Sequence, residues 1–197
     1  MGQSSDALTA DQITFIAAQK LFFVGTATAD STVNVSPKGR DALRVLDERR
    51  VIWLNLTGSG NETAAHVQAC PRMTLMFCAF EGPPQILRLY GTARTIQYGE
   101  ECGEAGWEAL FSHFEPLAGA RQIFDLAIER VQTSCGMAVP RYSYGGDRTE
   151  LDSWARRKGN DGLQRYWKRK NRRSIDGLPA PIPAPIPTPG TADASSD

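Results

Sequence analysis

Two short stretches of the sequence carry residue types that together could bind an anion. The first is VNVSPKG, residues 33–39, in which a hydroxyl and an ammonium group, Ser36 and Lys38, flank a proline. The two valines alternate with polar residues as in a half-buried strand, and Pro37 cannot donate a hydrogen bond to a neighbouring strand. The stretch is therefore either an ordinary strand exit with a solvated lysine or one half of an anion site.

The second stretch is LTGSGNET, residues 56–63, in which two glycines free the backbone just before a predicted helix. Unpaired N–H groups at the start of a helix attract phosphate, and three polar side chains would add donors there. These side chains are Ser59, Asn61 and Thr63. The plainer interpretation is a helix N-cap with a flexible lead-in. The stretch lacks both the lysine of a Walker A loop and the third glycine of a dinucleotide-binding fingerprint.

Lys38 could supply the cation that a phosphate at this glycine-rich loop would recruit. The two stretches come together if the strand Val33–Lys38 neighbours the strand Val51–Leu56 in an antiparallel sheet. The exit at Ser36–Lys38 would then face the helix mouth at Gly58–Thr63.

Alternating and continuous apolar patterns predict the strands that position these stretches. The strands are Leu21–Ala29, Val33–Lys38, Leu43–Leu46, Val51–Leu56, Arg72–Phe80, Ile86–Ile96 and Arg121–Thr133, the last of which also suits a helix. The first four should form two hairpins. A total of about six strands with tight turns favours a mostly antiparallel β-barrel with peripheral helices over a doubly wound sheet.

Helices are expected around and after these strands. The short ones start after Thr9, run from Asn61 to a stop at Pro71, and lie within Gly103–Phe114. Residues 149–173 should form one helix, or two helices broken at Gly159 or Gly162. We predict a disordered N-terminus at residues 1–8, one domain over residues 9–177 and a proline-rich disordered tail at residues 178–197.

Composition narrows the function classes. The 197 residues carry a formal net charge of zero, which argues against a nucleic-acid or membrane partner, although residues 148–173 hold ten Lys or Arg and three acids. Four cysteines without a CxxC pair and two histidines make a metal site unexpected and indicate reduced thiols in a cytoplasmic protein. Neither a signal peptide nor an apolar run of transmembrane length is visible.

The order of several motifs resembles the pyridoxamine 5′-phosphate oxidase-like family of flavin-binding split β-barrels. The motifs are NVSPKG, VIWLNL, GSGNETAAHV, CPRMTLMF and ILRLYGTA. The later segments VQTSCGMAVP and KNRRSIDGLP are similar to a particular subgroup of that family. The resemblance covers roughly residues 10–178.

This resemblance implies a six-stranded split β-barrel that works as a homodimer with FMN at the interface. The strand around Lys38 and the loop from Ser59 to Thr63 would hold the FMN phosphate. The full set of residues implied for cofactor binding is Asn34, Val35, Ser36, Pro37, Lys38, Ser59, Gly60, Asn61, Thr63 and Arg88.

The chain departs from the pyridoxamine-phosphate oxidases themselves. Where those enzymes place further basic residues, this sequence has Val33 and Asn61–Thr63, and the C-terminal arginine and histidine pattern is absent from SIDGLPAP. The resemblance therefore implies a flavin fold rather than the named oxidase activity.

The leading hypothesis is an FMN-dependent oxidoreductase acting on a small molecule, with no catalytic side chain assigned because the flavin ring carries the chemistry. The alternatives are a non-catalytic flavin- or haem-binding protein of the same fold and a reductase that uses the deazaflavin F420.

Overall fold

The computed structural model describes residues 2–183. Its strands are β1 (Gln3–Ser5), β2 (Phe22–Thr26), β3 (Asn34–Lys38), β4 (Leu43–Asp47), β5 (Arg50–Leu56), β6 (Arg72–Cys78), β7 (Ile86–Gln97) and β8 (Ala120–Ser134). Its helices are α1 (Ala10–Ala18), α2 (Glu62–Ala69), the 3-10 turn η1 (Gly103–Ala105), α3 (Trp107–Phe111) and α4 (Glu150–Lys170).

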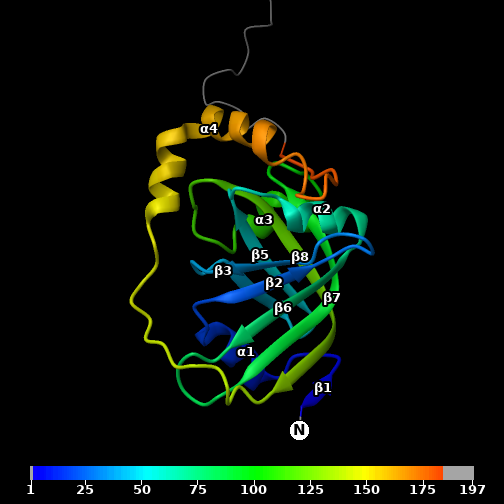
Figure 1. Cartoon of the computed structure of the whole chain (residues 1–197), viewed down its shortest axis with the longest axis vertical. Coiled ribbons are helices and arrows are strands. Elements are labelled where there is room, and N and C mark those ends of the chain that lie inside the picture. The colour runs from blue at the N-terminus through cyan, green and yellow to red at the C-terminus, as the bar shows by residue number, and fades with distance from the viewer. Residues whose placement is uncertain (1, 184–197) are drawn as a thin grey trace, which may run out of the picture.

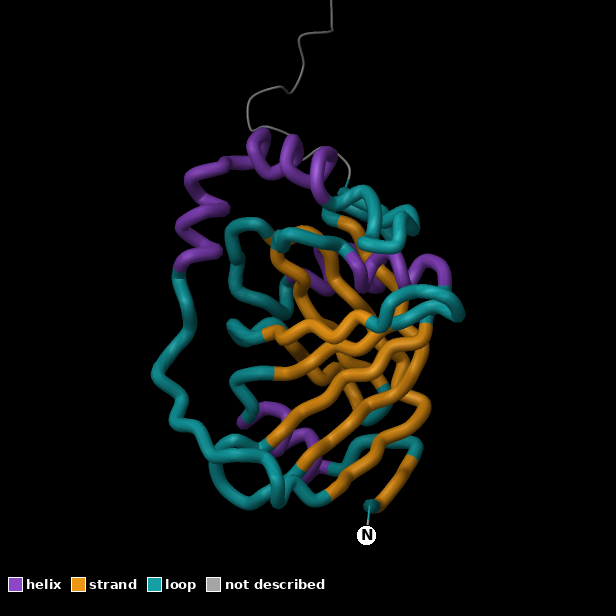
Figure 2. Tube along the Cα trace, in the orientation of Figure 1, coloured by secondary structure: helices purple, strands orange, loops and turns teal. Residues whose placement is uncertain are grey.

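All the strands join one antiparallel sheet in the order β3-β2-β6-β7-β8-β5-β4, and β1 pairs with β8 beside this path. The strands form the body of the molecule, with α1 at one end and α4 across the other (Figures 1 and 2). The protein is therefore mostly β, with an antiparallel sheet and few helices, as predicted.

The strand β5 is buried along nearly its whole length because it is covered on both faces. Val51 and Trp53 point into one apolar cluster with Phe22 and Phe124. The alternate residues Ile52 and Leu54 point into a second cluster built around α3. This explains why VIWL reads as a continuous apolar run rather than an alternating one.

The long pair β7 and β8 bends at a bulge between Tyr90 and Gly91. A Cβ atom at position 91 would lie 1.9 Å from the carbonyl oxygen of Ala127, so only glycine fits this close approach. The bulge allows the two strands to curve together.

The predicted helix signals are confirmed at both ends of the chain. Thr9 and Gln12 form a reciprocal capping box at the start of α1, with N···O distances of 2.9 and 3.3 Å. In α4 the helix breaks at Gly159, where φ is 61°, so the predicted break is confirmed at the first of the two glycines.

Three sequence expectations need correction. The described residues form eight strands rather than about six; Gln3–Ser5 is an unpredicted strand that pairs with β8, whereas the predicted strand Arg121–Thr133 is confirmed. Residues 1–8 are thus not uniformly frayed, and Leu8 is buried. At the other end, Leu178–Pro183 also packs on the fold, as the hydrogen bond from Ala180 N to Arg172 O shows. The rest of the predicted tail, residues 184–197, lies outside the described residues.

The two anion-binding stretches were expected to meet if β3 and β5 were neighbouring strands. The sheet does not pair these two strands. They nevertheless come close because the sheet curls. The ammonium nitrogen of Lys38 in β3 lies 3.5 Å from Asn55 Oδ1 in β5. No strand pairing within residues 2–183 joins β3 to β4, so curling is shown and closure into a barrel is not.

Candidate functional site

The strand β3 divides the predicted binding residues between two faces. Residues paired directly across strands point to the same face, and Asn34, Ser36 and Lys38 lie opposite the buried residues of β2. These three side chains therefore point inward. Val35 and Pro37 point outward, and Val35 is 63% exposed. The structure thus gives only alternate members of the stretch access to the interior.

Lys38 carries its ammonium group into this interior. Its Nζ atom lies 5.2 Å from the ring centroid of Trp53, in addition to its contact with Asn55. Burial, and then the charge of Arg121, lowers the pKa of Lys38 to about 8. Among the described residues, no acidic side chain forms an ion pair with Lys38.

A second cation, Arg121 at the start of β8, is buried beside it. Arg121 is 2% exposed, and both terminal nitrogens lie 3.3 Å from the carbonyl oxygen of Gly60 in the glycine-rich loop. Burial lowers the pKa of Arg121 to about 10. Sequence reasoning missed this residue, although an arginine at the edge of an apolar strand segment was a signal that could have found it.

Several polar atoms in this region are buried without a hydrogen-bond partner. They include Ser36 Oγ, Trp53 Nε1 and Arg121 Nε. Buried polar atoms in folded proteins are nearly always paired, so unpaired atoms clustered around two cations mark a place where a ligand could supply the missing partners. We call Ser36, Lys38, Trp53 and Arg121 the inner cation cluster.

Two polar side chains of the glycine-rich loop, Asn61 and Thr63, have hydrogen-bond partners within the chain. Asn61 stands at the N-cap position of α2 but makes no capping bond, and its amide instead donates to Asn171 O at 3.2 Å and Pro181 O at 2.9 Å. Thr63 accepts a hydrogen bond of 3.2 Å from Asn34. Ser59 is exposed. The assignment of these residues to a cofactor stays a prediction.

A C-terminal strap, residues 171–182, covers the glycine-rich loop. The Asn171 amide donates to the carbonyl oxygens of Gly58, Ser59 and Gly60 at 3.2–3.4 Å. The backbone N–H of Ile175 donates to the carboxylate of Glu62, the first residue of α2. The helix mouth is therefore held by the strap and carries a carboxylate, which sequence reasoning did not foresee.

Arg88 lies away from the inner cation cluster. Arg88 pairs with Met76, Met76 pairs with Phe23, and Phe23 pairs with Pro37 across the adjacent strands. Because paired residues point to the same face, Arg88 points outward, as Pro37 does. Its Nη1 donates to Ser134 Oγ at 3.2 Å. The structure does not bring Arg88 together with Lys38, and its predicted cofactor contact is untested.

The family pattern described as pyridoxamine 5′-phosphate oxidase matches residues 8–135. The chain belongs to this family. It is 36% identical over 177 residues to the pyridoxamine 5′-phosphate oxidase family protein ustO of Aspergillus flavus, an alignment that covers 82% of this chain and 70% of that protein. The family resemblance stated from the motifs is thus confirmed.

Solved structures agree on the fold. A pyridoxamine 5′-phosphate oxidase-like protein from Lactobacillus delbrueckii aligns with a TM-score of 0.50 and 22% identity, covering 64% of this chain and 94% of that one. HupZ from Group A Streptococcus aligns with a TM-score of 0.51 and 20% identity, covering 64% and 98% of the two chains. At these identities the likeness shows the fold alone.

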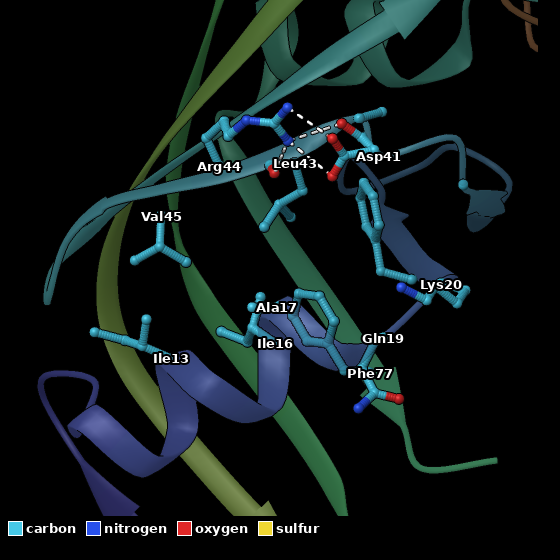
Figure 3. Close-up of a pocket in the computed structure, with 13 residues that line it drawn as sticks. Ile13, Ile16, Ala17, Gln19, Lys20, Asp41, Leu43, Arg44, Val45 and Phe77 are labelled. Atoms are coloured by element: carbon cyan, nitrogen blue, oxygen red, sulfur yellow. Dashed lines mark hydrogen bonds and ion pairs between the residues drawn. The ribbon is translucent and has the colours of Figure 1, made fainter. Parts of the chain in front are cut away.

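In this family member, a pocket of about 380 Å³ lies between α1 and β4 (Figure 3). Ile13 and Ile16 of α1 face Leu43 and Val45 of β4 across it (Figure 3). Phe22 also lines the pocket, and its ring centroid lies 6.1 Å from that of Trp53. A small apolar group bound here would therefore be one side chain away from the cluster.

Residues 2–183 contain no group of three or more His, Cys, Asp or Glu side chains arranged to hold a metal ion. Within the same range, no helix combines the length and apolar character needed to cross a membrane.

Proposed function

We propose that this chain is an FMN-binding oxidoreductase that acts on a small molecule, works as a homodimer, and closes its curled sheet into a split β-barrel of the flavin-binding type. The proposal goes beyond family membership. It combines the cofactor that the motif resemblance implies with the charge pattern of the inner face.

The observation that carries the proposal is the desolvated ammonium group of Lys38, which lacks an acidic partner within residues 2–183. A buried unpaired charge is unfavourable, and a bound anion would relieve it. The hydroxyl of Ser36 is also buried and unpartnered on the same face. These two side chains fit a phosphate group such as that of FMN.

When bound, FMN supplies the electron-transfer chemistry through its ring, so no acid–base side chain is required. The chain's own residues bind and exclude water. Lys38 and Ser36 would hold the phosphate. The Trp53 ring packs against Phe124, with 4.4 Å between the ring centroids, and forms an apolar surface beside Lys38. The strap fixes the glycine-rich loop through Asn171.

The homodimer is supported by the exposed side of β3. Val33, just before β3, and Val35 within it are 68% and 63% exposed, and β3 is an edge strand of the sheet. Apolar side chains on an unpaired edge favour association with another chain. Sedimentation of the purified protein should therefore give twice the mass of 21.6 kDa.

The absorption spectrum of the purified protein tests the cofactor. FMN, haem and F420 absorb differently, so a flavin spectrum, or one acquired on adding FMN, supports the proposal. Anaerobic reduction of the bound flavin by NAD(P)H or a substrate panel then separates an oxidoreductase from a protein that only binds flavin. A protein that stays colourless with FMN and shows no thermal shift contradicts the proposal.

A variant tests the residue. Lys38→Ala should weaken FMN binding more than tenfold, because it removes a charge-assisted phosphate contact of about 1.5–3 kcal/mol. Lys158→Ala, at an exposed lysine of α4, is the matched control and should bind FMN as the parent does. Equal FMN affinity in the Lys38 variant and the parent would remove Lys38 from the site.

A further inference from the structure

Two cations that lack an acidic partner within residues 2–183, the partly buried Lys38 and the buried Arg121, lie close enough to interact electrostatically. We propose that Arg121 and Lys38 together bind a phosphate monoester dianion, with Arg121 as a phosphate ligand that the sequence motifs do not reveal. The inference rests on the proposed function only for the identity of the molecule that carries the phosphate.

Three other arginines of residues 2–183 have a carboxylate partner. Arg50 and Arg94 share the carboxylate of Asp125, at 2.9 and 2.8 Å. Arg40 pairs with Asp152 at 2.8 Å. Arg121 is more buried than any of these three, yet it forms no ion pair with a carboxylate of residues 2–183, and its guanidinium donates to the carbonyl oxygen of Gly60.

The unpartnered donors of the inner cation cluster indicate the chemistry of a ligand. Trp53 Nε1 and Arg121 Nε can only donate hydrogen bonds, and the ammonium group of Lys38 has only the long 3.5 Å contact with Asn55 Oδ1. A ligand that satisfies them must offer acceptor oxygens and negative charge. A phosphate dianion carries several acceptor oxygens and up to two charges, which matches two cations and the Ser36 hydroxyl better than a single carboxylate does.

The position of Arg121 links this ligand to the glycine-rich loop. Its guanidinium touches Gly60, and Asn171 of the strap donates to the same carbonyl oxygen at 3.3 Å. The loop itself has Asn61 and Glu62 after Gly60 and no basic residue. The cation missing from the loop is supplied by β8.

The experiment compares thermal unfolding of the parent and of Arg121→Met in chloride buffer with and without inorganic phosphate. Inorganic phosphate should raise the midpoint of the parent but not of Arg121→Met. Without phosphate, Arg121→Met should unfold no lower than the parent, because methionine fills similar space without a buried charge. Arg130→Met, at an exposed position of the same strand, is the control and should keep the parent's response to phosphate.

A purely structural role for Arg121 predicts the opposite pattern. If Arg121 only tethers Gly60, the methionine variant unfolds at a lower temperature without phosphate and still responds to phosphate as the parent does. That result, or a parent that does not respond to phosphate, overturns the inference.

The source of the phosphate is distinguished by comparing FMN with riboflavin, which lacks it. If the phosphate belongs to the flavin, Arg121→Met binds FMN about ten- to a hundredfold more weakly and binds riboflavin unchanged. If the FMN preference survives while the response to inorganic phosphate is lost, the phosphate belongs to the substrate, and the anion site still stands. A parent that binds no flavin refutes the proposed function and leaves the phosphate comparison as the test of the site.

Discussion

The affinity of this protein for FMN should fall as the pH rises above neutrality, because Lys38 gives up its proton there. Most lysines hold their proton to about pH 10.4, but burial and the charge of Arg121 lower the pKa of unbound Lys38 to about 8. A bound phosphate dianion would favour the charged form and return this pKa towards its ordinary value. Binding therefore takes up a proton at alkaline pH.

The size of the effect follows from the protonated fraction of the unbound lysine. With a pKa of about 8, about nine-tenths of Lys38 is protonated at pH 7 and about one-tenth at pH 9. FMN should thus bind about tenfold more weakly at pH 9 than at pH 7. The phosphate ester loses its second proton near pH 6, so its own charge is nearly constant over this range.

The assay is a titration of the parent with FMN by fluorescence quenching or calorimetry at pH 7, 8 and 9 and constant ionic strength. Riboflavin, which has no phosphate, reports effects of pH on the ring site. Lys38→Arg provides a side chain that stays charged, so its FMN affinity should be nearly independent of pH. An unchanged FMN affinity in the parent, or the same slope in Lys38→Arg, would refute the assignment of the proton to Lys38.

In the unliganded protein, the lowered pKa of Lys38 makes stability increase with pH, whereas FMN binding weakens. Between about pH 8 and pH 10.4 the unfolded chain keeps the Lys38 proton while the folded chain has released it. The unfolded state then binds more protons, so the free energy of unfolding rises with pH across this window, by about 3 kcal/mol at most. Below pH 8 the unfavourable buried charge is fully present.

Three further predictions concern the scaffold, and chemical denaturation measures each of them. Asn171→Ala, which removes the partner of three loop carbonyls, should lower the free energy of unfolding by about 2 kcal/mol, whereas Asn160→Ala on the exposed side of α4 should change it by less than about 0.5 kcal/mol. Asp125→Asn should lower the free energy of unfolding by about 2 kcal/mol. Burial raises the pKa of Asp125, but its two arginine partners outweigh this effect and lower it, so the parent should lose this contribution only below about pH 4. Gly91→Ala should destabilise by about 3 kcal/mol through its clash with the β8 backbone, while Gly145→Ala, with open space around it, should be nearly neutral. Equal effects in a variant and its control, or an Asp125→Asn protein as stable as the parent at pH 7, would contradict the corresponding contact.

Local signals in the sequence predicted most of the secondary structure. The cap at Thr9, the break at Gly159 and the alternation in the hairpin strands act within a few residues, so they could be read without the fold. The ambiguous segment 121–133 is a strand because β5 and β7 both pair with it, and no local pattern contains that information.

The candidate site was predicted only in part, for a physical reason. Lys38 was found because proline and glycine mark its strand exit, but its cationic neighbour lies 83 positions later in the chain. Arg121 reaches the glycine-rich loop because the strands β5 and β8 pair side by side. The strap was missed because its contacts come from asparagine and backbone groups, which carry no recognisable spacing.

The strap also sets an order of events during synthesis. The ribosome makes a chain from its N-terminus, so Asn61 emerges 110 residues before its partner Asn171. The sheet can form before the strap exists, but the glycine-rich loop cannot reach its final hydrogen bonds until the strap has left the ribosome. A chain that stops before position 171 would therefore be nearly complete as a sheet and still lack a finished loop, which ties the maturation of the site to the synthesis of the strap.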